Sequence, residues 1–314
     1  PYDTPADIFF PQKLREAGFY FYFSRKIREL RECGHEGTAR AYASSLRSMQ
    51  RYLGKKDFPF IKLSSRIISD YQGKLLASGI CDNTIGFYLH NIKALFRKGC
   101  REMGLELPCP FRDISIKTEK TLKRSLDPVV IKTLSAIELE KDSPLSLARD
   151  IFMFSFYTRG MSFVDIALLK KRHVFPGEIC YRRHKTDQLM RVGINKEISR
   201  ILERYKNVPG EYIFPLFPAE RDPYAGYRSA YHRIRYSLGK ISRVIGLEFP
   251  LRLHAARHSW ATIAKVNGAS VHVIGECLGH TSEKTTRIYL KELDHSALDA
   301  VNNQVADFIL AVDD

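Results

Sequence analysis

No two cysteines of this chain form a C-x-x-C pair, and the six that it contains are scattered along its length. Zinc sites and the disulfide frameworks of small secreted proteins both require recurrent cysteine spacing. The pattern therefore predicts free thiols in a reducing cytoplasm, and it predicts no metal site.

Long apolar runs are missing as well. No stretch approaches the roughly eighteen apolar residues that a membrane-spanning helix needs, so we expect no membrane partner. The N-terminal end has no basic stretch followed by an apolar one, so we expect no secretory leader. Because the first residue is Pro1 and not Met, we expect either a processed chain or a part of a longer one.

Acidic residues are outnumbered everywhere except at the C-terminal end, and the net charge is +15. Residues 1–124 contain 23 Lys and Arg against 13 Asp and Glu, and residues 125–289 contain 26 against 16. Residues 290–314 reverse the balance, with 1 basic residue and 6 acidic ones. Two basic blocks followed by an acidic tail predict two lobes that face a polyanion and a tail that does not.

The length of 314 residues is enough for two domains. Residues 12–105 repeat apolar side chains at helical spacing, with glycine breaks between the segments. Four helices are predicted there, with starts near residues 14, 38, 64 and 82, and they would form a small bundle. Residues 1–11 are left as an N-terminal extension.

Residues 106–124 contain Pro108 and Pro110 and are otherwise polar and basic, which predicts a linker. Asp127 and Pro128 then give an N-cap followed by proline at the first helical position, a typical helix start. A second domain over residues 125–289 is predicted to mix helices with three short β segments near 173–175, 179–184 and 189–194. The expected fold class is mainly α with a small β-sheet: a four-helix domain followed by a mixed α+β domain.

The residues that carry chemistry gather between His254 and Tyr289. His254 and Arg257 stand three apart, so they share one face of a predicted helix, while His280 follows a glycine turn. A tyrosine needs proton removal and a cationic site to attack at neutral pH. The arginine fork binds phosphate oxygens, and histidine stabilises charge or moves a proton. The set predicts nucleophilic attack on a phosphodiester without a metal.

The order and spacing of these groups resemble the tyrosine recombinase, or phage integrase, family. The family pattern is H-x-x-R-H-[ST]-[FW]-A-T, then L-G-H, then Y. This chain reads H-A-A-R-H-S-W-A-T from His254, L-G-H ending at His280, and I-Y ending at Tyr289. The resemblance is specific across about residues 150–289, and across residues 12–124 it rests on architecture and charge. It implies that the first domain binds the core recombination site, that the second is catalytic, and that no cofactor is used.

The resemblance also implies roles for the individual residues. Tyr289 would attack one DNA strand and form a 3′-phosphotyrosine that stores the bond energy. Arg257 would bind the phosphate, with His254 and His280 as flanking groups that donate hydrogen bonds and move protons. Lys185, in a predicted turn between two β segments, is similar to the family's hairpin lysine, the general acid for the leaving 5′-oxygen.

The first catalytic arginine departs from the family pattern G-L-R-x-x-E-[LI]. The chain has G-M-S-F-V-D-I from Gly160, so Ser162 occupies the place of the arginine. Serine cannot bind a phosphate through two parallel N–H donors. Arg159, about one helical turn earlier, is expected to substitute; otherwise another basic residue does, or the enzyme works with one arginine. Asp165 keeps the place of the acid, and we expect it to be structural.

Basic residues on the predicted helices are candidates for DNA contact. A long helix at 224–245 interleaves arginines with tyrosines, and it either crosses the major groove or is a basic surface helix. The acidic tail, 290–314, carries an apolar stripe that predicts a helix docked on a neighbouring subunit or on its own domain. The DNA-binding candidates are Arg40, Arg47, Lys93, Arg97, Lys98, Arg228, Arg233 and Arg235.

The leading interpretation is a site-specific DNA recombinase that cuts and rejoins strands within a tetramer. Its work would be integration and excision of a mobile element, DNA inversion, or chromosome-dimer resolution, and the serine-containing motif resembles mobile-element integrases and invertases most. The expected partners are double-stranded DNA sites, further subunits and accessory DNA-bending proteins, at the nucleoid. The alternatives are a type IB topoisomerase and a DNA-binding regulator that has lost catalysis.

Overall fold

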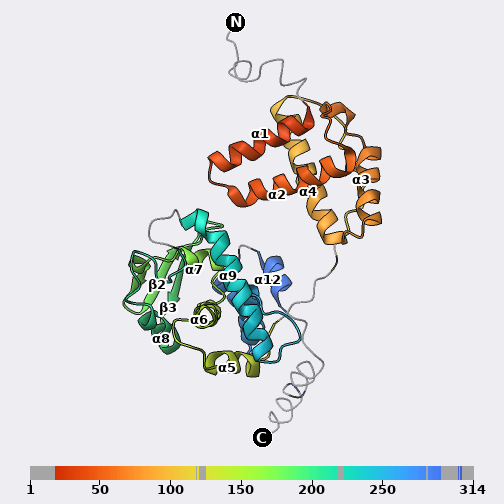
Figure 1. Ribbon diagram of the computed structural model, residues 1–314. Coiled ribbons are helices and arrows are strands. Elements are labelled where there is room, and N and C mark those ends of the chain that lie inside the picture. The colour runs from red at the N-terminus through yellow and green to blue at the C-terminus, as the bar shows by residue number, and fades with distance from the viewer. Residues whose placement is uncertain are drawn as a thin grey trace. The chain divides into compact units, whose positions relative to one another are not determined.

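Residues 18–117, 119, 125–217, 223–280, 282–290, 303 and 305 are described in the computed structural model, without the side chains of 223–225, 288 and 289. The chain divides near residue 121 into two compact units (Figure 1). The expected N-terminal extension, and nearly all of the expected C-terminal helix, lie outside the described residues. Across the described ranges, no helix is both long and apolar enough to cross a membrane.

The first unit contains the four predicted α-helices. Ser64 caps the third by accepting a hydrogen bond from the Ile67 amide. The second helix begins at Glu36, before the predicted start at Thr38. Gly34, with φ of 75°, already reverses the chain, so the turn is complete before Gly37. The helices are α1 (Phe19–Glu32), α2 (Glu36–Leu53), α3 (Ser65–Ala77) and α4 (Asp82–Glu102), with a short 3-10 turn η2 (Phe60–Lys62) between α2 and α3.

Aromatic side chains fill the core of this unit. Phe19 lies edge-on to Phe60 with 5.0 Å between ring centroids, and Phe60 stacks on Phe96 at 5.9 Å. Gly99 makes this packing possible, because a Cβ atom there would lie 2.5 Å from the Phe60 ring. Each fully buried ring of this kind contributes on the order of 1.5–3 kcal/mol, so the bundle has a core of its own.

The predicted linker begins too early. Phe111 is only 2% exposed and belongs to the aromatic core of the first unit, against which Ile114 and Ile116 also pack. The Asn83 side chain accepts from the Glu119 amide and donates to its carbonyl oxygen, at 3.0 Å each. The two prolines follow α4, but the apolar residues after them return to the bundle. The polar composition of the segment therefore led to a predicted linker that starts too early.

The second unit places α6 at its centre. The sequence of α6 is mostly apolar and most of its residues are buried, as expected for a helix that other elements surround. Ser143 caps it, and Asp127 caps the preceding helix as predicted. The helices are α5 (Pro128–Ala136), α6 (Pro144–Tyr157), α7 (Phe163–Ala167), α8 (Lys196–Arg204), α9 (Pro223–Val244), α10 (Leu253–Val266), α11 (Val271–Leu278) and α12 (Glu283–Tyr289).

A small antiparallel sheet lies between α7 and α8. Its strands are β1 (Val174–Phe175), β2 (Glu178–Arg182) and β3 (Leu189–Gly193), in the order β1-β2-β3. In β2 and β3, Ile179 faces Val192 and Tyr181 faces Met190, and these alternate residues are the buried ones. The sheet and the helices around it confirm the predicted fold class.

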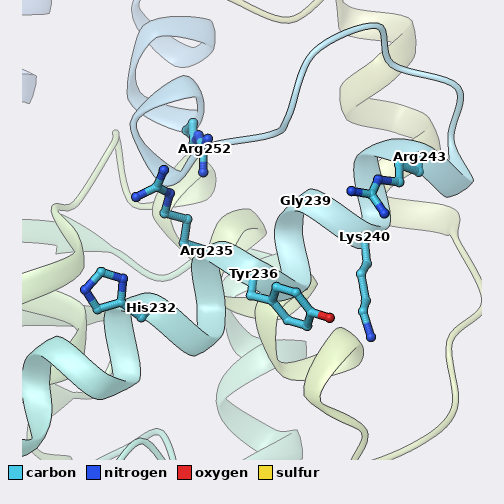
Figure 2. A pocket seen from close by; sticks show the side chains of 7 residues that line it. All are labelled: His232, Arg235, Tyr236, Gly239, Lys240, Arg243 and Arg252. Carbon is cyan, nitrogen blue, oxygen red and sulfur yellow. The ribbon is translucent and has the colours of Figure 1, made fainter.

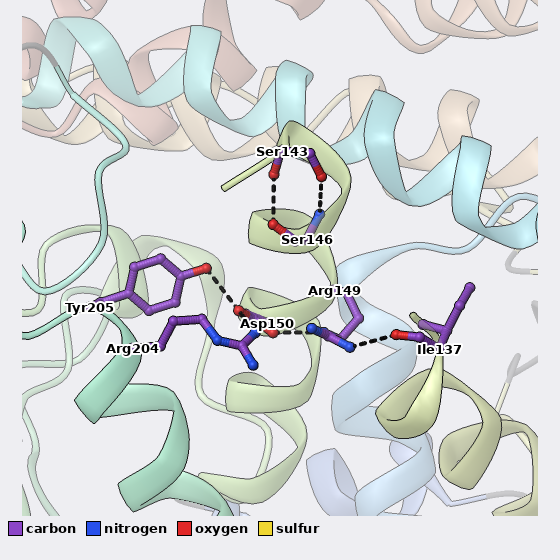
Figure 3. A network of polar contacts seen from close by, with 7 residues as sticks. All are labelled: Ile137, Ser143, Ser146, Arg149, Asp150, Arg204 and Tyr205. Carbon is purple, nitrogen blue, oxygen red and sulfur yellow. Dashed lines mark hydrogen bonds and ion pairs between the residues drawn. The ribbon is translucent and has the colours of Figure 1, made fainter. Parts of the chain in front are cut away.

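A buried carboxylate ties α6 to its neighbours. Asp150 is 2% exposed, and its oxygens accept from Arg149 Nε at 2.6 Å, Arg204 Nη1 at 2.5 Å and Tyr205 Oη at 2.8 Å (Figure 3). Arg149 also donates to the Ile137 carbonyl at 3.0 Å. A buried charge is tolerated only when it is paired and hydrogen-bonded. The network therefore fixes α5 and α8 against the central helix.

Candidate active site

The turn between α6 and α7 carries Arg159 and Gly160 in the left-handed region, with φ of 60° and 75°. For a residue other than glycine this conformation is strained, and such strain concentrates at functional sites. Gly160 has a second constraint, because a Cβ atom there would lie 2.6 Å from Arg257 Cγ. Only glycine lets this turn lie against α10.

Arg257 is 5% exposed and lies where three segments meet. Its Nη1 donates to the Gly160 carbonyl at 2.8 Å, and its Nη2 donates to the Leu278 carbonyl at 2.5 Å. Nη2 also lies 2.9 Å from His280 Nε2. The guanidinium of α10 is thus positioned by the α6–α7 turn and by the end of α11. The structure brings the side chains of Arg257 and His280 together, which a shared role at one phosphate requires.

His280 is neutral at physiological pH. Burial lowers its pKa to about 4, and the positive charges of Arg257, Arg183 and Lys185 act in the same direction. A guanidinium only donates, so His280 Nε2 must accept from Arg257. The ring proton is therefore on Nδ1, which lies 3.1 Å from the Thr286 hydroxyl of α12.

The turn of the β2–β3 hairpin lies close to His280. Lys185 is exposed in its turn, as predicted, and lies close enough to His280 to influence the pKa of that ring. Arg183 Nη1 donates to the Gly279 carbonyl at 2.5 Å. Gly279 has φ of 64°, and a Cβ there would lie 2.9 Å from Met190 Sδ, so this glycine turn packs directly on the hairpin. The motif analysis missed Arg183, although it stands two residues before Lys185 in the same predicted hairpin.

Ser162 and Asp165 are used structurally. Ser162 caps α7, and its hydroxyl donates to Asp165 Oδ2 at 2.6 Å. Asp165, 5% exposed, accepts the His184 amide on Oδ1 at 2.8 Å. The carboxylate thus connects α7 to the hairpin.

Arg159 lies near the same site. Burial raises the pKa of Tyr181 well above its usual value, and the Asp165 charge adds to that rise. The positive charges of Arg183, Arg257 and Arg159 oppose it. The charges of three arginines therefore reach one buried tyrosine of β2, and Arg159 and Arg257 are two of them.

The two remaining catalytic candidates lie on α10 and α12. His254 is exposed in the first turn of α10, with its ring 4.7 Å from that of His258. Tyr289 is the last residue of α12, and its side chain lies outside the described part of the chain. Ser259, fully buried in the same motif, accepts the Leu126 amide at 2.7 Å and so fastens the start of the second unit.

The DNA-binding candidates of the first unit lie on α2 and α4. Arg40 Nε pairs with Glu36 at 2.7 Å, and Lys98 Nζ lies 3.9 Å from Glu102. Arg47 lines a surface pocket of about 360 Å³ that two further arginines of α1 also line. Those α1 residues are Arg28 and Arg31, and the remaining candidates on α4 are Lys93 and Arg97.

The candidates on α9 are in different environments. Arg228 is exposed, whereas Arg233 donates to the Leu216 carbonyl at 2.8 Å and so has one donor engaged within the protein. Arg235 lines an open groove of about 480 Å³ (Figure 2). Figure 2 shows that the other side of this groove comes from Arg252, two residues before His254. The groove is lined by His232, Arg235, Tyr236, Gly239, Lys240, Arg243 and Arg252.

Among the described residues, no group of three or more His, Cys, Asp or Glu side chains is placed to bind a metal ion. The described side chains of the site offer guanidinium, imidazole and ammonium groups. These groups stabilise an anionic transition state and move protons.

The comparisons with known proteins agree with this arrangement. Residues 125–295 match the phage integrase family, and residues 18–111 match the phage integrase SAM-like domain. The tyrosine recombinase XerC of Shewanella oneidensis is 26% identical over 226 residues, which cover 69% of this chain and 70% of that protein.

Two solved structures share the fold. The Tn1549 transposon integrase in complex with a circular intermediate DNA superposes with a TM-score of 0.67 at 15% identity, over 92% of this chain and 99% of that one. A lambda integrase tetramer bound to a Holliday junction gives a TM-score of 0.62 at 15% identity, over 90% and 82%.

A helical unit followed by an α+β unit that gathers arginines, a histidine and a hairpin lysine is the architecture of an enzyme that acts on phosphodiesters. The chain belongs to the phage integrase family, whose match covers more than half of it. This confirms the resemblance found in the motifs, and with it the expected enzyme class, the tyrosine-type site-specific DNA recombinases. Neither the topoisomerase nor the inactive regulator is favoured.

Proposed function

We propose that this enzyme cuts and rejoins DNA strands through a covalent bond between Tyr289 and a 3′-phosphate. The observation that carries the proposal is the buried guanidinium of Arg257, positioned by the Gly160 and Leu278 carbonyls and by His280. A preorganised cation of this kind binds charge that develops on a phosphate without reorganising during the reaction.

In the proposed cleavage step, side chains of this protein supply and accept every proton that moves. The Tyr289 oxygen attacks the phosphorus, the bond to the 5′-oxygen breaks, and Lys185 supplies the proton that this leaving oxygen takes. His254 accepts the proton of the tyrosine, and Arg257 with Arg159 binds the two non-bridging oxygens. Rejoining is the reverse, with a 5′-hydroxyl as the attacking group. The reaction therefore needs no hydrolysis of ATP.

His254 is assigned the proton transfer because His280 is already engaged. The Nε2 of His280 accepts from Arg257, and its Nδ1 proton faces Thr286. A histidine in this state supports the arginine rather than serving as the base. His254 is exposed at the beginning of α10, where a bound strand has access to it.

Double-stranded DNA is the proposed partner. The groove between α9 and Arg252 is lined by four Lys or Arg side chains, and one of them, Arg252, stands two residues before His254. Lys and Arg bind the phosphate backbone and release counterions on binding, without reading the bases. The groove therefore suits the phosphates that flank the cleaved one, and the arginines of α1 and α2 suit a contact of the first unit with the same duplex.

Recombination requires more than one active site, so we infer that the chain works as a tetramer on two DNA sites. The lambda integrase tetramer on a Holliday junction supports this assembly by analogy of fold. Movement of a mobile element or inversion of a DNA segment is the proposed biological setting, in the nucleoid. Accessory DNA-bending proteins belong to the same proposal.

The test is covalent trapping on DNA. Fragments that flank the gene, each nicked near a candidate site so that cleavage cannot reverse, are incubated with the protein and run under denaturing conditions. We expect an SDS-resistant adduct through a 3′-phosphate with the wild type and none with Tyr289→Phe, which should still bind. Binding without an adduct on every fragment would instead favour an inactive DNA-binding protein.

A second readout distinguishes the two enzyme classes. Supercoiled plasmids with two sites are expected to yield recombinant products in amounts that rise steeply with protein concentration. Relaxation of plasmids without any site, by single subunits, would assign the chain to the topoisomerases.

A further inference from the structure

Thr286 has no role in the mechanism above, yet it is fully buried in α12. It is 0% exposed and stands three residues before Tyr289, about one helical turn. Its hydroxyl lies 3.1 Å from His280 Nδ1. The helix that ends at the nucleophile is thus hydrogen-bonded to the histidine that contacts Arg257.

The donor and acceptor in this chain of contacts follow from chemistry. Arg257 has only N–H donors, so His280 Nε2 accepts at 2.9 Å and carries no proton. The neutral ring then carries its proton on Nδ1 and donates it to Thr286 Oγ1. If the ring adopted the other tautomer, two donors would face each other at Arg257, and Nδ1 would require a donor from Thr286.

Packing fixes the position of the threonine hydroxyl. A Cβ atom on Gly275 of α11 would lie 2.9 Å from Thr286 Oγ1, so only glycine permits this approach of α11 and α12. The hydroxyl therefore lies close to both Gly275 and His280. The charged groups that face the ring come from α10 and from the hairpin: Arg257, Arg183 and Lys185.

We propose that Thr286 is a positioning residue that couples the docking of α12 to the alignment of Arg257, by fixing His280 in the tautomer with its proton on Nδ1. When α12 is docked, the threonine hydroxyl accepts a hydrogen bond from Nδ1–H and Nε2 faces the guanidinium. When α12 leaves, this hydrogen bond is lost and the ring no longer helps to define the position of Arg257. The effect on strand cleavage rests on the proposed function, whereas the tautomer does not.

The tautomer is measured directly by NMR on the full chain without DNA. With ¹⁵N-labelled histidine, and the His280 signals identified by their loss in His280→Gln, we expect a protonated Nδ1 and an unprotonated Nε2. Thr286→Val keeps the shape but removes the hydroxyl, and is expected to shift the signals toward a mixture of tautomers. Thr286→Ser should restore the wild-type pattern, and the exposed neighbour substitution Thr285→Val should leave it unchanged.

Cleavage of the nicked substrate gives the functional readout. Loss of one buried hydrogen bond predicts that Thr286→Val slows adduct formation by about tenfold or more, with DNA affinity unchanged. Thr286→Ser should recover most of the rate, and Thr285→Val should cleave like the wild type. Gly275→Ala is a second variant that retains both polar partners and displaces the hydroxyl, and it should be slow as well.

Different results contradict different statements. A proton on Nε2 in the wild type, or signals that Thr286→Val leaves unchanged, would overturn the tautomer and the coupling with it. Wild-type cleavage rates in both Thr286→Val and Gly275→Ala would overturn the role in catalysis. If the wild type forms no adduct while the NMR pattern is as expected, the proposed function fails and the hydrogen-bonded arrangement stands.

Discussion

At the residue scale, the substitution of Ser162 for the family's arginine makes Arg159 the residue to test. Arg159→Ala should reduce adduct formation by about 100-fold or more, because the phosphate would lose one of its two guanidinium groups. Arg159→Lys should recover little, since lysine lacks the planar fork. Single-turnover cleavage of nicked DNA measures both.

The matched control for Arg159 is Arg172→Ala, which removes an exposed arginine of the same unit. It should leave the cleavage rate within about twofold of the wild type. This effect is much smaller than the one expected from the loss of a preorganised contact with the phosphate. Near-normal cleavage by Arg159→Ala would show that another basic residue substitutes, and Arg183 would be the next candidate because it contacts Gly279.

The titration of His280 gives a prediction about stability. Its pKa is about 4 in the folded chain, mainly through burial, against an ordinary value of 6.5. Between these values the unfolded chain takes up a proton that the folded chain does not, so this contribution to stability is full above pH 6.5 and is lost as the pH falls toward 4. Denaturant unfolding at pH 7 and pH 5 should therefore show a smaller loss for His280→Gln than for the wild type.

The exposed His272 provides the control for this titration. His272→Gln makes the same substitution on the surface of α11 and should leave the stability at pH 7 near the wild-type value, because the ring is 70% exposed. Equal pH dependence of the wild type and His280→Gln would mean that the ring is not kept neutral by its surroundings.

The motif residues show what could be predicted from the sequence at this scale. Arg257 and His280 were recognised from their short motifs, and Lys185 from its resemblance to the family's lysine in a turn between two β segments. Thr286 and Arg183 could not be found in this way. Their roles depend on which carbonyl or ring lies opposite them, and this is decided by the packing of distant segments.

At the scale of elements, the hairpin that carries Lys185 depends on one carboxylate. Asp165 accepts from the His184 amide and from Ser162. Asp165→Ala would leave these two part-buried donors without their acceptor, at a cost of about 1 kcal/mol. We expect a lower Tm and faster hydrogen exchange at the His184 amide, together with slower strand cleavage.

The control is Asp187→Asn on the same hairpin. Asp187 is 81% exposed and pairs with Arg182 at 3.2 Å, an exposed ion pair that contributes little. Asparagine removes the charge and tolerates the φ of 53° at this position, so the Tm and the cleavage rate should stay nearly unchanged. If Asp187→Asn and Asp165→Ala had equal effects, the hairpin would be positioned by other contacts.

Elements whose ends are capped were predicted well, and those defined by distant packing were not. Ser64 and Asp127 cap α3 and α5 where the sequence placed them. The segment around Phe111 has the composition of a linker, yet its apolar side chain is buried in the first unit. A helix cap can be predicted from the local sequence. The burial of one phenylalanine cannot, because it depends on the space that four packed helices leave.

At the scale of the whole molecule, positive charge occurs in both units, and much of it is paired with acidic residues. Arg191, Arg200 and Lys206 each contact a glutamate on the surface of the second unit. The basic residues of the groove beside α9 line one continuous surface instead. The distribution of charge, more than the net value of +15, therefore determines where a polyanion binds.

This difference can be measured with two triple variants of equal charge. Arg235→Ala, Lys240→Ala and Arg243→Ala together should weaken DNA binding and reduce the slope of log K against log salt by about 0.9 for each lost phosphate contact. Arg191→Ala, Arg200→Ala and Lys206→Ala remove the same net charge from paired positions and should leave that slope near the wild-type value. Binding to labelled duplex from low to moderate salt gives both slopes. Equal slopes for the two variants would mean that net charge governs binding, and the groove would then be no phosphate site.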